Sequence, residues 1–80
     1  MITITFKYFG VVQEATQKEE EQVVFSESVL SESVVKNWIK SQYGNILTEN
    51  IRIAVNQNFV ADFNITENAE IAFLPPFAGG

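Results

Sequence analysis

The sequence contains neither cysteine nor histidine among its 80 residues. The lack of cysteine excludes disulfides, thiol nucleophiles and thiolate metal sites, and the lack of histidine removes the commonest metal ligand and general base. A chain with so few reactive side chains is poorly equipped to act as an enzyme alone. It also lacks an apolar run near the ~20 residues that span a bilayer, and its alternating start is unlike a signal peptide. We therefore expect a cytoplasmic protein with no membrane contact.

Basic residues are scarce as well, with five Lys and Arg against ten Asp and Glu and a net charge of −5. Nucleic-acid binding requires clustered positive charge, so this balance argues against a nucleic-acid partner and favours a basic protein surface. The acidic run Glu19–Glu21 fits such a contact, although a short acidic run is more often a solvated turn.

Apolar residues are plentiful, at 46% of the chain, and include seven Phe and one Trp. This composition is that of one folded domain with a thin core. Residues 2–9 alternate apolar and polar side chains, which predicts a strand with one buried face. The alternation puts Phe9 on the solvent face, where either a partner or a loop would have to cover it.

The rest of the chain divides into further strands and one helix. The polar segment 10–21 is expected to be a connection, and residues 22–26 a second strand that forms a hairpin with the first. An apolar stripe with helical spacing predicts a helix that begins at Ser28 or Ser31, holds Trp38 in the core and ends near Gly44. Strands are predicted at 51–56, 59–61 and 69–74, with a turn at residues 57–58.

The resulting order, β, β, α, β, β, β, predicts an α+β fold in which one main helix packs across a mixed sheet of four to five strands. With the first and last strands parallel at the centre, this is the β-grasp, or ubiquitin-like, arrangement. We expect residues 1–76 to form this domain and residues 77–80 to form a flexible C-terminal tail ending in GlyGly.

The ending "PPFAGG" is the remaining oddity. Two prolines restrict the backbone to extended conformations, Phe77 supplies one apolar contact, and the following residues taper to glycine. Such an end fits a narrow channel, because glycine has no side chain to obstruct it. Taken from the residues alone, such an end is more often a frayed terminus.

Three stretches carry a resemblance to a known family: "YFGVVQEAT", "AVNQNFV" and "ENAEIAFLPPFAGG". In this order they resemble the MoaD-type small subunits of molybdopterin synthase, within the ubiquitin-like sulfur carriers (MoaD and ThiS). The resemblance covers essentially the whole chain, and the PPxxGG ending is its most specific part.

The resemblance implies a chemistry at the carboxyl terminus. An adenylating enzyme of the MoeB type would use ATP to activate the Gly80 carboxylate, and a sulfur donor such as a cysteine desulfurase system would convert it to a thiocarboxylate. The loaded carrier would then donate sulfur to cyclic pyranopterin monophosphate, which builds the molybdopterin dithiolene of the molybdenum cofactor. The chain itself would bind no cofactor.

The resemblance also implies a partner, the large subunit of molybdopterin synthase (MoaE type), in a heterotetramer. Three residues match positions of an apolar docking patch for that partner: Phe9, Phe59 and Leu74. Five residues match the segment that inserts into it: Pro75, Pro76, Phe77, Ala78 and Gly79.

The chain departs from the family pattern in three places. Gln13 replaces an arginine that many relatives carry, "TENAE" replaces a Gly-Asp turn, and Phe77 and Ala78 replace smaller or hydroxylated residues. Two alternatives remain: a sulfur carrier for thiamine thiazole or another thiocarboxylate pathway, and a ubiquitin-like module that conjugates to lysines or only docks.

Overall fold

The computed structural model describes residues 1–75. Its elements follow one another in the order β1 (Ile2–Tyr8), α1 (Gly10–Thr16), β2 (Glu20–Phe25), β3 (Leu30–Ser31), α2 (Glu32–Tyr43), β4 (Arg52–Val55), β5 (Asn58–Phe59), β6 (Asn64–Ile65) and β7 (Ala69–Leu74). Within residues 1–75, neither helix is long and apolar enough to cross a bilayer.

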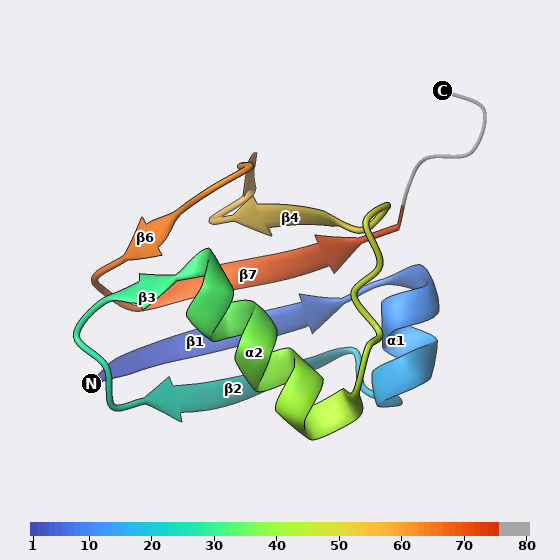
Figure 1. Ribbon diagram of the computed structural model, residues 1–80, viewed down its shortest axis with the longest axis horizontal. Coiled ribbons are helices and arrows are strands. Elements are labelled where there is room, and N and C mark those ends of the chain that lie inside the picture. The colour runs from blue at the N-terminus through green and yellow to red at the C-terminus, as the bar shows by residue number, and fades with distance from the viewer. Residues whose placement is uncertain (76–80) are drawn as a thin grey trace.

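A five-stranded mixed sheet forms the centre of the fold, in the order β2-β1-β7-β4-β5. The first and last strands, β1 and β7, are parallel, and the other neighbours are antiparallel. Helix α2 lies across one face of this sheet, and α1 sits at the end where β1 and β7 finish (Figure 1). This topology confirms the predicted β-grasp fold with its parallel central pair.

The core lies between α2 and the sheet. Phe6 is fully buried in β1, and its ring stacks on Trp38 of α2 with the centroids 5.3 Å apart and on Phe73 of β7 at 5.7 Å. Aromatic pairs at such distances contribute about 0.5–1.5 kcal/mol each beyond their buried area. Trp38 is therefore the core anchor that the helical spacing predicted.

Helix α2 has the ends that the sequence indicates. Of the two predicted caps, Ser31 is the one used, because its hydroxyl accepts a hydrogen bond of 3.3 Å from the Val34 N–H. Gly44 ends the helix at φ +81°, a backbone conformation that favours glycine.

The prediction of a connection over residues 10–21 was wrong. Residues Gly10–Thr16 form α1, which the Phe9 carbonyl starts by accepting hydrogen bonds from the N–H groups of Val12 and Gln13. Val12 and Thr16, four residues apart, are buried against the sheet. Because these two side chains are the helix's whole buried face, tertiary packing rather than an apolar stripe holds it.

Two local predictions also need correction. The acidic run is not a solvated turn, since Glu20 and Glu21 begin strand β2 and the Glu21 side chain is half-buried. The turn between β4 and β5 is one residue earlier than predicted, at Asn56 and Gln57, which have φ values of 49° and 71°. Two positive φ values in a two-residue loop suit the twist of a hairpin.

Candidate functional site

The three predicted docking residues lie on one side of the sheet. Strand pairing places Phe59 opposite Ala54, Ala54 opposite Ala72, and Leu74 opposite Arg52. Because side chains alternate along a strand, all of these project from the face opposite α2, which we call the outer face. Phe9 follows β1 in an extended conformation and donates its N–H to the Phe73 carbonyl at 3.3 Å, so it continues this face beside Leu74.

The patch formed by Phe9, Phe59 and Leu74, called here the docking patch, is accessible. Phe9 is 41% exposed and Phe59 51% exposed, while Leu74 is half-buried. No loop covers Phe9 within residues 1–75, so the alternative of a tucked ring is not what the fold adopts. The use of this patch by a partner remains a prediction.

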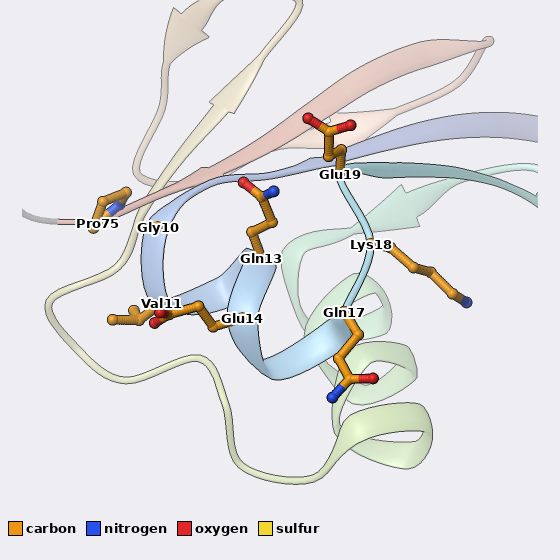
Figure 2. A pocket seen from close by; sticks show the side chains of 8 residues that line it. All are labelled: Gly10, Val11, Gln13, Glu14, Gln17, Lys18, Glu19 and Pro75. Atoms are coloured by element: carbon orange, nitrogen blue, oxygen red, sulfur yellow. The ribbon is translucent and has the colours of Figure 1, made fainter.

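Pro75 marks the point where the chain leaves the sheet, and it packs on Gly10. A Cβ built on Gly10 would lie 2.8 Å from Pro75 Cγ and 3.3 Å from its Cβ, closer than carbon atoms pack. Gly10 also has φ +55°, so both the close approach and the backbone angle require glycine. Figure 2 shows the two residues side by side at the start of α1.

An open groove follows α1 from this contact. It is lined by Gly10, Val11, Gln13, Glu14, Gln17, Lys18, Glu19 and Pro75 (Figure 2). Gln13, the residue that departs from the family's arginine, is thus placed near the base of the C-terminal segment. Any contact that the arginine makes in relatives is available here only to a neutral amide.

Arg52 is a residue of this surface that the sequence analysis missed. Its guanidinium carbon lies 4.6 Å from the centroid of the Phe59 ring, a cation–π contact, and its cross-strand neighbour is Leu74. Its alternation with Ile51 and Ile53 in "IRIAVN" was the available signal, because that alternation puts the arginine on the solvent side of the strand.

A polar cluster closes the opposite face of the sheet near the end of β1. The Glu21 carboxylate accepts a hydrogen bond of 2.5 Å from the Tyr8 hydroxyl and another from the Tyr43 hydroxyl, and Lys18 Nζ lies 3.1 Å from its other oxygen. Burial, the hydrogen bond to Glu21 and its charge raise the pKa of Tyr8. Burial would raise the pKa of Glu21, but the hydrogen bonds from Tyr43, Tyr8 and Lys18 lower it below its ordinary value.

This cluster ties β1, β2, α2 and the segment after α1 together. In residues 1–75 no three acidic side chains converge to hold a metal ion. The predicted reactive residue, Gly80, and the predicted inserted residues Pro76, Phe77, Ala78 and Gly79 lie outside the described residues.

Several solved structures have the same fold as this chain. The protein assigned as subunit 1 of molybdopterin converting factor from Pyrococcus furiosus superposes with a TM-score of 0.82 at 19% identity, over 96% of this chain and 100% of the other. Small archaeal modifier protein 1 from Haloferax volcanii gives 0.80 at 14% identity, over 96% and 100%. A chain of the complex of molybdopterin-converting factor subunits 1 and 2 from Helicobacter pylori gives 0.71 at 16%, over 99% and 100%.

At these identities the structural matches show a shared fold and no more. The sequence model of the ThiS family, however, matches residues 6–80, which is nearly the whole chain and includes both terminal glycines. The protein therefore belongs to the ThiS family of ubiquitin-like sulfur carriers.

Proposed function

We propose that this chain is the sulfur-carrying small subunit of molybdopterin synthase, with Gly80 as its reactive carboxyl terminus. The observation that carries the proposal is the family match through Gly79 and Gly80, on a chain that leaves the sheet from a central strand. An activating enzyme uses ATP to adenylate the carboxylate, a sulfur donor converts it to a thiocarboxylate, and the large subunit uses that sulfur on cyclic pyranopterin monophosphate.

The chemistry suits a chain with no thiol. A carboxylate is a poor electrophile because its negative charge repels nucleophiles, and a mixed anhydride with AMP removes that charge and supplies a leaving group. The absence of cysteine leaves the terminal carboxyl as the place where this chain can carry sulfur. The general acids and bases of the later steps then belong to the partners.

The docking patch supports a protein partner at the base of the C-terminal segment. Phe9 and Phe59 are large aromatic side chains that are about half exposed, and covering apolar surface gains roughly 25 cal/mol per Å². In the Helicobacter pylori complex a chain of this fold is assembled with subunit 2 of molybdopterin-converting factor. By analogy, the large subunit covers the patch here and receives Pro75, Pro76, Phe77, Ala78 and Gly79.

Charge favours the same arrangement. The chain carries a net charge of −5. The proposed substrate, cyclic pyranopterin monophosphate, carries a phosphate group. A basic pocket in the large subunit would hold both the phosphate and the anionic terminus and would steer an acidic carrier toward it.

Intact-mass measurement tests the carrier step. The protein is incubated with its cognate activating enzyme, ATP and a sulfide source, and we expect the mass to rise by the difference between sulfur and oxygen at Gly80. A variant lacking Gly80 is the matched control and should stay unchanged. No mass change in the wild type would exclude the carrier function.

A second experiment tests which biosynthetic pathway the carrier serves. The thiocarboxylated protein is added to the cognate large subunit with cyclic pyranopterin monophosphate. We expect molybdopterin to form. Sulfur delivery to a thiazole synthase alone would instead assign the chain to thiamine biosynthesis.

A second candidate is a ubiquitin-like modifier, favoured by the likeness to small archaeal modifier protein 1 at a TM-score of 0.80. A modifier forms an isopeptide bond between its terminal carboxyl and a lysine of another protein. Lysine conjugates that need Gly80 and the activating enzyme, found by mass spectrometry in cells, would support this role.

A further inference from the structure

We propose that Arg52 binds a carboxylate of the large subunit and thereby orients the carrier on it. The inference rests on the proposed function, because it concerns the partner that covers the docking patch. It adds one charged contact of defined position to a patch that is otherwise apolar.

The geometry prepares Arg52 for such a contact. The guanidinium lies over the Phe59 ring, at 4.6 Å from the centroid, and the arginine is exposed on the outer face. A cation–π contact uses none of the N–H donors of the guanidinium in a hydrogen bond to a protein oxygen, so a carboxylate can still accept two parallel hydrogen bonds from them. Less side-chain freedom is then lost when the pair forms.

Within residues 1–75, Arg52 also forms no ion pair, unlike most basic residues of the chain. The sequence has five Lys and Arg, and three of them are in ion pairs: Lys7 with Glu70, Lys18 with Glu21 and Lys36 with Glu32. Among residues 1–75, Arg52 and Lys40 take part in no ion pair. On the outer face, the charge of Lys7 is thus compensated by Glu70, 3.4 Å away, while that of Arg52 is available.

Docking of a partner on the patch would desolvate the charge of Arg52. Arg52 is the cross-strand neighbour of Leu74 and lies on Phe59, so a partner that covers these two residues removes water from the guanidinium as well. A desolvated charge without a partner opposes binding, whereas a charge with a well-placed counter-ion does not. The surface that fits is therefore apolar over the patch and carries an Asp or Glu beside Arg52.

The test measures binding of the full-length protein to the cognate large subunit by isothermal titration calorimetry. We expect Arg52→Glu to weaken binding by about 30-fold or more, the range for a charge-pair partner replaced at an interface. Arg52→Lys keeps the charge but loses the planar guanidinium, so its affinity for the large subunit should lie between those of the wild type and Arg52→Glu. Lys40→Glu is the matched control, because it changes net charge equally on α2, across the sheet from the patch.

Three results would overturn the inference. Equal losses in Arg52→Glu and Lys40→Glu would mean that overall charge alone matters, and unchanged binding in Arg52→Glu would mean that no carboxylate faces this residue. The third is a failure to find any acidic residue of the large subunit whose change to lysine restores binding of Arg52→Glu. Urea unfolding of each variant checks that the exposed substitution leaves the fold intact.

The same assay separates this inference from the proposed function. A wild-type protein that neither binds the large subunit nor transfers sulfur contradicts both. A wild type that transfers sulfur, beside an Arg52→Glu variant that binds equally well, contradicts only the role of Arg52.

Discussion

Replacing Gly10 with alanine places a methyl group between the start of α1 and the Pro75 ring. The new Cβ would lie 2.8 Å from Pro75 Cγ, whereas carbon atoms pack at about 3.5–4.0 Å. Either Pro75 moves by several tenths of an ångström or the first turn of α1 does. Pro75 is half-exposed and follows the last strand, so we expect it to move and to redirect the chain that leaves the sheet.

The magnitude follows from two separate costs. Alanine at φ +55° is strained by about 1–2 kcal/mol. Overpacking against Pro75 adds about 1–3 kcal/mol, and the smaller entropy of the unfolded alanine chain returns about 0.4–1 kcal/mol. We therefore expect Gly10→Ala to lower the free energy of unfolding by about 3 kcal/mol, about 2 of which come from the overlap.

A double-mutant cycle in urea unfolding isolates the overlap. Pro75→Ala removes the Cγ and Cδ atoms, so Gly10→Ala should cost about 1–2 kcal/mol less in that background than in the wild type. Gly44→Ala is the control, since Gly44 also has positive φ but has no atom within 4 Å of an added Cβ. Its cost should be the same in both backgrounds.

A coupling energy between Gly10 and Pro75 below about 0.5 kcal/mol would refute the reasoning, because even mutations at distant sites deviate from additivity by up to that amount. Sulfur transfer to cyclic pyranopterin monophosphate in the presence of the large subunit gives the functional measurement. Gly10→Ala should slow the transfer and Gly44→Ala should not, when both are assayed under conditions where the proteins are folded.

Three further predictions concern the core, the polar cluster and the patch. Phe6→Ala should cost about 3–5 kcal/mol, a large part of the stability of a domain this small, and a two-state urea transition close to the wild type would contradict the stacked core. Glu21→Gln should cost about 1–3 kcal/mol near neutral pH, because a neutral acceptor weakens its hydrogen bonds from the two tyrosines. The folded-state pKa of Glu21 is lowered, so its stabilisation is present above the ordinary glutamate pKa of about 4.3 and is lost as the pH falls through the lower folded value. The difference between wild type and Glu21→Gln should therefore shrink in acid, and urea midpoints that differ equally at neutral and acid pH would argue against this pairing. Phe59→Ser should change the free energy of unfolding by less than about 1 kcal/mol and weaken large-subunit binding. Val24→Ser is its control, because Val24 is an exposed residue of β2 on the same outer face of the sheet. Equal losses of binding in Val24→Ser and Phe59→Ser would contradict the position of the patch.

The sequence predicted the fold where periodicity was strong. Alternation in residues 2–9 identified β1, and the stripe around Val35 and Ile39 identified α2. The short apolar run before the two prolines identified β7. The end of α2 at Gly44 could be predicted because glycine adopts positive φ at little cost.

Helix α1 could not be predicted in the same way. Its segment has two buried residues, Val12 and Thr16, and begins with a glycine, so the local pattern resembles a loop. What stabilises it is the sheet beneath and the Phe9 carbonyl, which are known only when β1 and β7 have been paired. The strands β3 and β6, with two residues each, are too short for any period to appear.

The exposure of some residues of the candidate site could be predicted from the sequence, but the arrangement of the site could not. Phe9 stood out as an aromatic residue on a solvent face, whereas the polar cluster joins Tyr8, Glu21 and Tyr43, which come from separate elements. Arg52 could be assigned to the solvent side of its strand by alternation. Its position beside Leu74 and over Phe59 depends on strand order, which a single sequence does not contain.

Under the proposed function, strand order also limits where the carboxyl group of Gly80 can act. Leu74 is the last residue of β7 in the sheet, and it pairs with Arg52. The six residues from Pro75 to Gly80 span at most about 20 Å when fully extended, so we expect the reaction centre of the large subunit within that distance of the surface that covers the patch. A shift of the carrier by one strand spacing, about 4.8 Å, would use a quarter of that length. An apolar patch tolerates such sliding because the hydrophobic effect is non-directional. We expect a paired Arg52 and the contact of Pro75 with Gly10 to oppose such sliding, because both fix the position of Leu74 and Pro75 against the partner.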